Sequence, residues 1–152
     1  MLKKNLTFIL TVAISSCIFF ACGSSEPKSY VDGSYEGKSQ EHTQEGEDDS
    51  EEGNGYGIVN ITVKDGAISE CTYQTYMLDG TLKDSEYGKE GGAVANQDYY
   101  TKAQKAVAAC DEYAAQLVET GSLSGVDAIS GATINYEEFK EAVEDALSQA
   151  EE

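Results

Sequence analysis

The feature that most constrains the fold is a pair of β-like segments joined by the dipeptide Asp65-Gly66. Before this dipeptide, over residues 59–64, apolar side chains alternate with polar ones, which is the pattern of a half-buried strand. Asp-Gly is typical of a two-residue type I′ turn. The segment after it, residues 67–77, is rich in β-branched and aromatic residues. The sequence therefore predicts an antiparallel hairpin over residues 56–77.

Two later segments have the periodicity of helices. In residues 98–119 apolar side chains recur at steps of three and four, which places them on one helix face, and Gly121 is expected to end this helix. A second helix is expected to begin at Asn135 as its N-cap, with Glu138 at the capping-box position. A short strand is also expected around Tyr35. Strands followed by helices predict an α+β domain, with a small antiparallel sheet and helices packed on it.

The N-terminus has the pattern of an export signal. Two lysines precede an apolar run over residues 6–21, which is shorter than the ~20 residues of a bilayer span and matches the hydrophobic region of a secretory signal. Ala21-Cys22-Gly23 resembles the lipobox of bacterial lipoproteins, in which a diacylglycerol is attached to the Cys and cleavage occurs just before it. The resemblance implies a signal peptide over residues 1–21, a lipid on Cys22 and a location at the outer face of the cell membrane. The alternatives are an uncleaved signal anchor and an ordinary signal peptide.

Two polar segments lie on either side of the first predicted strand. Residues 22–31 are expected to be a tether between the membrane and a single domain over residues 32–150. Residues 41–53 contain seven acidic residues and almost no apolar ones. Such a segment cannot bury enough area to offset its ordering entropy, so we expect a flexible acidic loop. Ca²⁺ binding is the functional alternative, but the spacing does not match an EF-hand.

Charge and composition exclude several classes of function. The chain has ten Lys, no Arg and 28 acidic residues, for a net charge of −18. Nucleic acids need a basic surface, so we expect no nucleic-acid partner. A single His argues against a His-based metal site or a Ser-His-Asp triad, and no catalytic residue or metal ligand is predicted. Cys71 and Cys110 could form a disulfide in an oxidising compartment or be two buried small hydrophobic residues.

The segment between the two predicted helices has residues suited to phosphate. Residues 130–133, Ser-Gly-Ala-Thr, form a turn of small residues before a helix. Helix N-termini and nests of backbone N–H groups bind phosphate, and Thr133 adds a hydroxyl there. Asp127 is placed to hold the loop by accepting backbone hydrogen bonds. The same residues also suit an ordinary helix-capping loop, because caps use Asp, Ser and Thr.

These residues resemble a known motif. Asp127-x-x-Ser130-Gly131-Ala132-Thr133 is similar to the flavinylation motif, D-x-x-S-G-A-T, of the FMN-binding domain family. That family includes the FMN-carrying subunits of sodium-pumping NADH:quinone oxidoreductase and of Rnf complexes, and lipoproteins of extracellular electron transfer in Gram-positive bacteria. The resemblance extends to Asp32–Gly37, which is similar to the family's opening D-G-x-Y-x-G, and to Val59–Ile68. The acidic segment 41–53 is not part of the family core.

The resemblance implies a covalent flavoprotein. In the family, a flavin transferase joins the FMN phosphate to the last Thr of the motif by a phosphoester bond. Here that residue is Thr133, and Asp127, Ser130, Gly131 and Ala132 occupy the other motif positions. Since there is no Arg and little Lys near the motif in sequence, we expect backbone donors and the ester bond to neutralise most of the phosphate charge.

Three functions are consistent with these features. The first is an electron carrier between a quinone-linked membrane partner and an extracytoplasmic acceptor, and the others are a flavin-dependent reductase subunit and a non-flavin binding or adhesion lipoprotein. For the wall of the isoalloxazine ring, the candidates end the hairpin and suit the core equally well: Tyr73, Tyr76, Met77 and Leu78. Gly91-Gly92 could approach a ligand closely or be plain loop glycines. We also expect the many carboxylates to lower the potential of the flavin.

Overall fold

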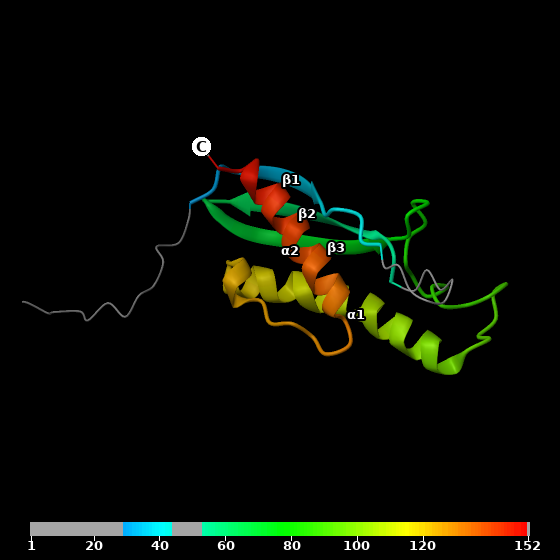
Figure 1. Cartoon of the computed structure of the whole chain (residues 1–152). Helices are drawn as coiled ribbons and strands as arrows, with labels where there is room; N and C mark the ends of the chain where they lie inside the picture. The colour runs from blue at the N-terminus through cyan, green and yellow to red at the C-terminus, as the bar shows by residue number, and fades with distance from the viewer. Residues whose placement is uncertain (1–28, 44–52, 152) are drawn as a thin grey trace, which may run out of the picture.

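The computed structural model describes residues 29–43 and 53–151 of the chain (Figure 1). The predicted signal peptide 1–21 and lipidation at Cys22 lie outside these residues. The same is true of residues 22–28 of the expected tether and residues 44–52 of the expected acidic loop. In the described part of the chain, no helix is both long and apolar enough to cross a membrane.

A three-stranded antiparallel sheet forms one layer of the domain. Its strands are β1 (Gly33–Lys38), β2 (Tyr56–Lys64) and β3 (Ala67–Tyr76), in the order β1-β2-β3. The turn between β2 and β3 has positive φ at both central residues, 54° at Asp65 and 76° at Gly66. This is the type I′ geometry, whose twist matches that of the strands it joins. The predicted hairpin and the first strand are confirmed.

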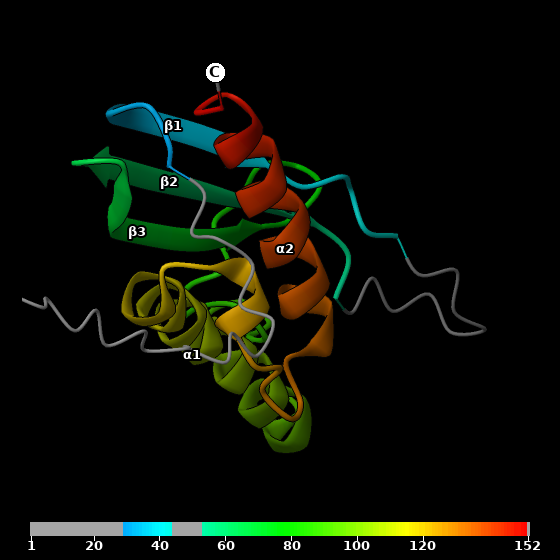
Figure 2. The same ribbon diagram turned by 90° about the vertical axis from the view of Figure 1, so that its left-hand side faces the viewer.

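Two helices form the second layer and cover the same face of the sheet (Figures 1 and 2). α1 (Gln97–Thr120) packs on β3, and α2 (Thr133–Ser148) packs on β1 and β2. A 3-10 turn, η1 (Leu123–Gly125), follows α1. The side chain of Asn96 caps α1 by accepting from the N–H of Tyr99 at 3.0 Å, and Gly121 ends the helix in the left-handed conformation. The predicted α+β fold is confirmed.

The core lies between the sheet and the helices. Tyr113 of α1 and Phe139 of α2 are fully buried with ring centroids 5.6 Å apart, and Tyr73 of β3 lies 4.9 Å from Phe139. Gly37 brings α2 onto β1, because a Cβ there would lie 2.5 Å from the backbone nitrogen of Ala146. This close approach explains why β1 needs glycine at this position.

The predicted start of the second helix is wrong. α2 begins at Thr133 with Ala132 as its N-cap, three residues before the expected cap, and Ala132 offers no side-chain hydrogen bond. Asn135 and Glu138, expected at the cap, are instead 7% and 3% exposed. The Asn135 amide donates to the carbonyl of Ala106 at 3.0 Å, so tertiary contact with α1 replaces the local capping pattern.

The two cysteines of the domain are separate and free. Cys71 lies on β3 and is half-buried, and burial raises the pKa of its thiol to about 12. Cys110 is buried on α1, and desolvation again raises the thiol pKa. Both thiols are therefore neutral and chemically quiet, in agreement with the interpretation as small buried residues.

Candidate functional site

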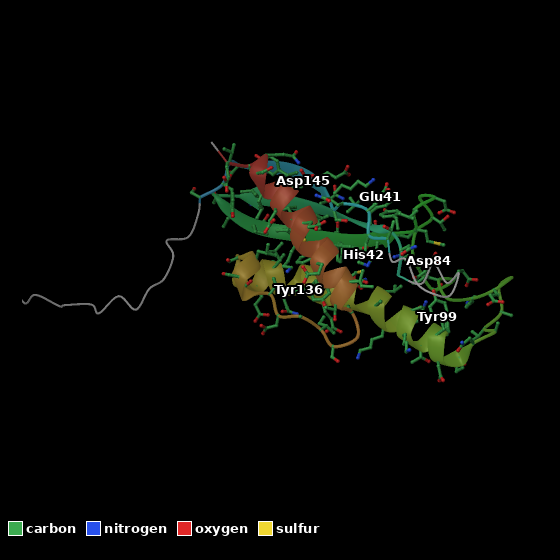
Figure 3. The ribbon with its side chains drawn as sticks, in the orientation of Figure 1. Glu41, His42, Asp84, Tyr99, Tyr136 and Asp145 are labelled. Carbon is green, nitrogen blue, oxygen red and sulfur yellow. The ribbon has the colours of Figure 1, made fainter. Side chains whose placement is uncertain are left out.

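Two tyrosine hydroxyls hold the loop that carries the Asp-x-x-Ser-Gly-Ala-Thr sequence. The hydroxyl of Tyr113 accepts from the N–H of Ile129 at 2.9 Å and donates to the carbonyl of Ala132 at 3.1 Å. The hydroxyl of Tyr136, which is labelled in Figure 3, donates to the carbonyl of Val126 at 2.9 Å. The loop is therefore fixed at both ends by rigid side chains from α1 and α2.

Thr133 occupies the first position of α2 and is exposed. The first N–H groups of a helix have no partner within the helix and carry its positive dipole end. Gly131, two residues before, has a φ of 83°, in the left-handed region that favours glycine. The Thr133 hydroxyl thus stands beside backbone donors at a turn that only small residues follow easily, which suits a phosphate group.

A pocket of about 340 Å³ opens beside Thr133. One wall is the motif, with Gly131, Ala132 and Thr133. A second wall is α1, and the remaining lining comes from Gly53, the end of β3, the loop after β3 and the start of α2. A pocket of this volume, with both apolar and polar lining, is of the size that binds a small molecule or a large part of a cofactor.

The motif residues do not all meet in this pocket. Gly131, Ala132 and Thr133 line it, whereas Ser130 and Asp127 are exposed residues of the loop outside the lining. Within the described residues, the Asp127 carboxylate makes no hydrogen bond. Its backbone N–H donates to the side chain of Gln116 at 2.8 Å. Holding the loop, the role expected of Asp127, is performed by Tyr113, Tyr136 and Gln116.

Lysines surround the pocket, although few lie near the motif in sequence. Lys83 and Lys102 line it, and the Lys105 ammonium would lie 3.3 Å from a Cβ placed on Gly131. The scarcity of Lys near the motif therefore holds for the sequence and not for the folded domain. The lysines reach the motif through tertiary structure, because α1 and the loop after β3 bring three of them to it. Lys102 and Lys105 are three residues apart and share a helix face, a spacing that could have signalled a basic patch.

The aromatic wall is also different from the predicted one. Tyr87 and Tyr99 line the pocket, with ring centroids 6.4 Å apart. Tyr73 belongs to the core, and Tyr76 stacks on Tyr56 at 5.5 Å. Of the four candidates, none lines the described pocket. Gly91-Gly92 have nothing within 4 Å of the Cβ positions, which fits plain loop glycines.

Comparison with known proteins decides the family. A family model described as FMN-binding domain matches residues 52–148, more than half of the chain. The chain belongs to the FMN-binding domain family. The chain is therefore a flavin-binding protein, and the domain expected from the motif is confirmed at this level.

Two solved structures from clostridia are similar to this chain. A crystal structure of a Clostridium perfringens protein has 24% sequence identity over 80% of this chain and 88% of its own, with a TM-score of 0.53. A solution NMR structure of a Clostridium thermocellum protein has 25% identity over 80% of this chain and 92% of its own, with a TM-score of 0.39. The first supports the fold. No curated protein matches the chain.

The residues of the pocket fit FMN. The phosphate suits the N-terminus of α2, where backbone N–H groups and the ammonium of Lys105 are available. The aromatic ring system suits the wall of Tyr87, Tyr99 and Val107. Within residues 29–43 and 53–151, no group of three metal-ligating side chains lies together.

Proposed function

We propose that the protein is an extracytoplasmic electron carrier whose FMN is joined through its phosphate to Thr133. The observation that carries this proposal is that Thr133, the first residue of α2, lines the pocket together with Lys102, while the ammonium of Lys105 lies beside Gly131. A helix N-terminus and a cation both favour a phosphate oxygen. The hydroxyl beside them would be esterified by a flavin transferase, which is the partner needed for maturation.

The flavin supplies the one- and two-electron chemistry, and the protein supplies its position. Gly131 and Ala132 leave room for the phosphate, because neither has a side chain larger than a methyl group. Tyr87 and Tyr99 hold the ring, and Lys83 at the pocket lining favours negative charge there. Attachment by the phosphate would leave the ring free to exchange electrons and prevent loss of the cofactor outside the cell.

The membrane anchor is part of the same proposal. The lipobox-like sequence ending at Cys22 supports export and lipid attachment at the outer face of the cell membrane. An N-terminus with three acyl chains would hold the protein firmly at the membrane, since one acyl chain alone gives only marginal membrane binding. The anchored carrier would receive electrons from a quinone-linked membrane partner. If the protein is instead a flavin-dependent reductase subunit, the chain should reduce a substrate directly, without passing electrons to another protein.

The carrier role is tested with membranes of cells that contain the full-length chain and a flavin transferase. NADH should bleach the flavin absorbance through the membrane quinones, and a soluble electron acceptor should restore it. Cys22→Ser should release the protein from the membrane and slow the bleaching at least tenfold, whereas Cys71→Ser, the matched control, should not. Rapid NADH-driven turnover of a small substrate by the purified protein alone would favour the reductase instead.

A further inference from the structure

A buried carboxyl group on α2 has no hydrogen-bond partner among the described residues. Glu138 of α2 is 3% exposed, and neither of its carboxyl oxygens has a hydrogen-bond partner in the part of the chain that the structure describes. A buried polar side chain is nearly always hydrogen-bonded, so this one needs an explanation. Nothing in the binding of a phosphate or a ring requires a carboxyl group at this place.

A buried lysine connects Glu138 with the pocket. Lys83 is 6% exposed and lines the pocket, and its charge acts on Glu138. Its ammonium donates to the carbonyl of Gly53 at 3.3 Å and not to the Glu138 oxygens. Asn135, one turn before Glu138 on α2, also lines the pocket. The charge of Lys83 therefore acts on the carboxyl group of Glu138, and Lys83 also lines the pocket.

The groups around Glu138 set its protonation. Burial raises the pKa of Glu138, the charge of Lys83 lowers it and that of Glu141 raises it, and together these effects bring the pKa to about 7. From β3 and α1, Glu138 faces Tyr73 and Cys110, whose raised pKa values keep both neutral. After β1, the Nε2 of His42 is likewise buried and unpartnered within the described residues, and His42 pairs with Gly55. Lys83 is therefore the cation that balances Glu138 when it ionises.

We propose that Glu138 takes up a proton when the pocket gains negative charge, and that Lys83 couples the two sites. When Glu138 is ionised it shares the positive charge of Lys83, and when it is protonated that charge is available to the pocket. The inference rests on the proposed function, because reduction of the bound flavin is the event that adds charge. Glu138 does not touch the reacting atoms; it acts on the pocket only through the charge of Lys83.

The step balances as follows for reduction by dithionite, which supplies the electrons and is oxidised to sulfite. Two electrons enter the flavin together with the proton that the ring itself takes. One further proton passes from solvent to a carboxyl oxygen of Glu138, where an O–H bond forms and the carboxylate becomes a carboxylic acid. Reoxidation of the flavin reverses the transfer and returns the proton to solvent.

The test is the infrared difference spectrum, reduced minus oxidised, of the full-length flavin-loaded protein at about pH 8. A C=O stretching band of a protonated carboxyl group should appear on reduction and shift when glutamate is labelled with ¹³C. Glu138→Gln should abolish this band, and Lys83→Met should reduce it at least twofold. Glu137→Gln, an exposed carboxylate paired with Lys140, should leave it unchanged.

The outcomes separate this inference from the proposed function. Flavin-loaded wild-type protein that is reduced without a ¹³C-sensitive carboxyl band overturns the inference and leaves the carrier intact. A band that persists in Glu138→Gln overturns it as well. A protein that takes no flavin contradicts the proposed function instead. Because the labelling measurement needs only the wild type, failure of a variant to fold does not protect the inference.

Discussion

Single side chains account for the shape of the motif loop. Tyr113 is fully buried, and its one hydroxyl serves the N–H of Ile129 and the carbonyl of Ala132 at once. Ala132 itself has no side chain that could cap α2. The position of Thr133 therefore depends on a hydroxyl contributed by a helix that lies earlier in the chain.

Tyr113→Phe should destabilise the domain and reduce flavin attachment. The variant leaves the N–H of Ile129 without its partner, and it removes one of the two donors to the carbonyl of Ala132, which still accepts from the N–H of Tyr136. Leaving a buried donor without a partner costs about 1–3 kcal/mol. Urea unfolding would measure the stability, and flavin fluorescence in a denaturing gel would measure attachment. Tyr35→Phe is the control, because its hydroxyl donates only to the exposed carbonyl of Val31. Equal flavin yields in the two variants would contradict this role for Tyr113.

Glu138→Gln should change how stability depends on pH. Because burial raises the folded pKa of Glu138 to about 7, the native state holds a proton that the unfolded chain loses near pH 4.5. Stability from this group is complete below pH 4.5 and falls until about pH 7. The variant should therefore gain about 2 kcal/mol relative to wild type between pH 5 and pH 8. A pH-independent difference in unfolding free energy would exclude the raised pKa.

Among the helices and strands, features set by neighbouring residues could be predicted from the sequence, whereas contacts between distant segments could not. The β2–β3 hairpin follows from alternation and from Asp65-Gly66, both of which act between neighbours in sequence. Asn135 and Glu138 were misassigned because a capping pattern cannot reveal contact with α1. Lys83, Lys102 and Tyr87 could not be assigned to the site for the same reason: only the packing of α1 on β3 brings them to the motif.

The contact between α2 and β1 should be sensitive to one methyl group. Gly37→Ala would place a Cβ 2.5 Å from the backbone nitrogen of Ala146, so α2 must shift. We expect a loss of about 2 kcal/mol or more in urea unfolding, as for overpacked cores. Gly33→Ala is the control, since its nearest atoms belong to the flexible end of Tyr35. If Gly37→Ala loses no more unfolding free energy than Gly33→Ala, α2 tolerates the displacement and the prediction is contradicted.

The whole molecule combines a strongly negative chain with a pocket that is locally basic. The net charge is −18, yet Lys83, Lys102 and Lys105 lie around the proposed flavin site. Distant exposed charges are screened beyond about 10 Å at 0.1 M salt, whereas near and buried charges are screened much less. The overall charge and the local lysines therefore act on the flavin in opposite directions and respond differently to salt.

Raising the ionic strength from about 0.01 M to about 1 M should raise the midpoint potential of the bound flavin. Salt removes the repulsion that exposed carboxylates exert on the reduced, more negative state, and leaves the effect of buried Lys83 in place. Spectroelectrochemical titration at the two salt concentrations measures the shift. A potential that falls with salt would mean that the lysines, and not the carboxylates, dominate the long-range field.

Covalent attachment at Thr133 is the central claim and has the most direct test. The full-length chain is produced with a flavin transferase and digested, and the mass of the peptide that contains Thr133 is measured. The account predicts a gain of one FMN less one water, located on Thr133 by fragmentation. Thr133→Ala should lose the gain, and Thr101→Ala, an exposed threonine of α1, should keep it. The account would be contradicted if Thr133 stayed unmodified although the same transferase, produced with another member of the family, modified that protein.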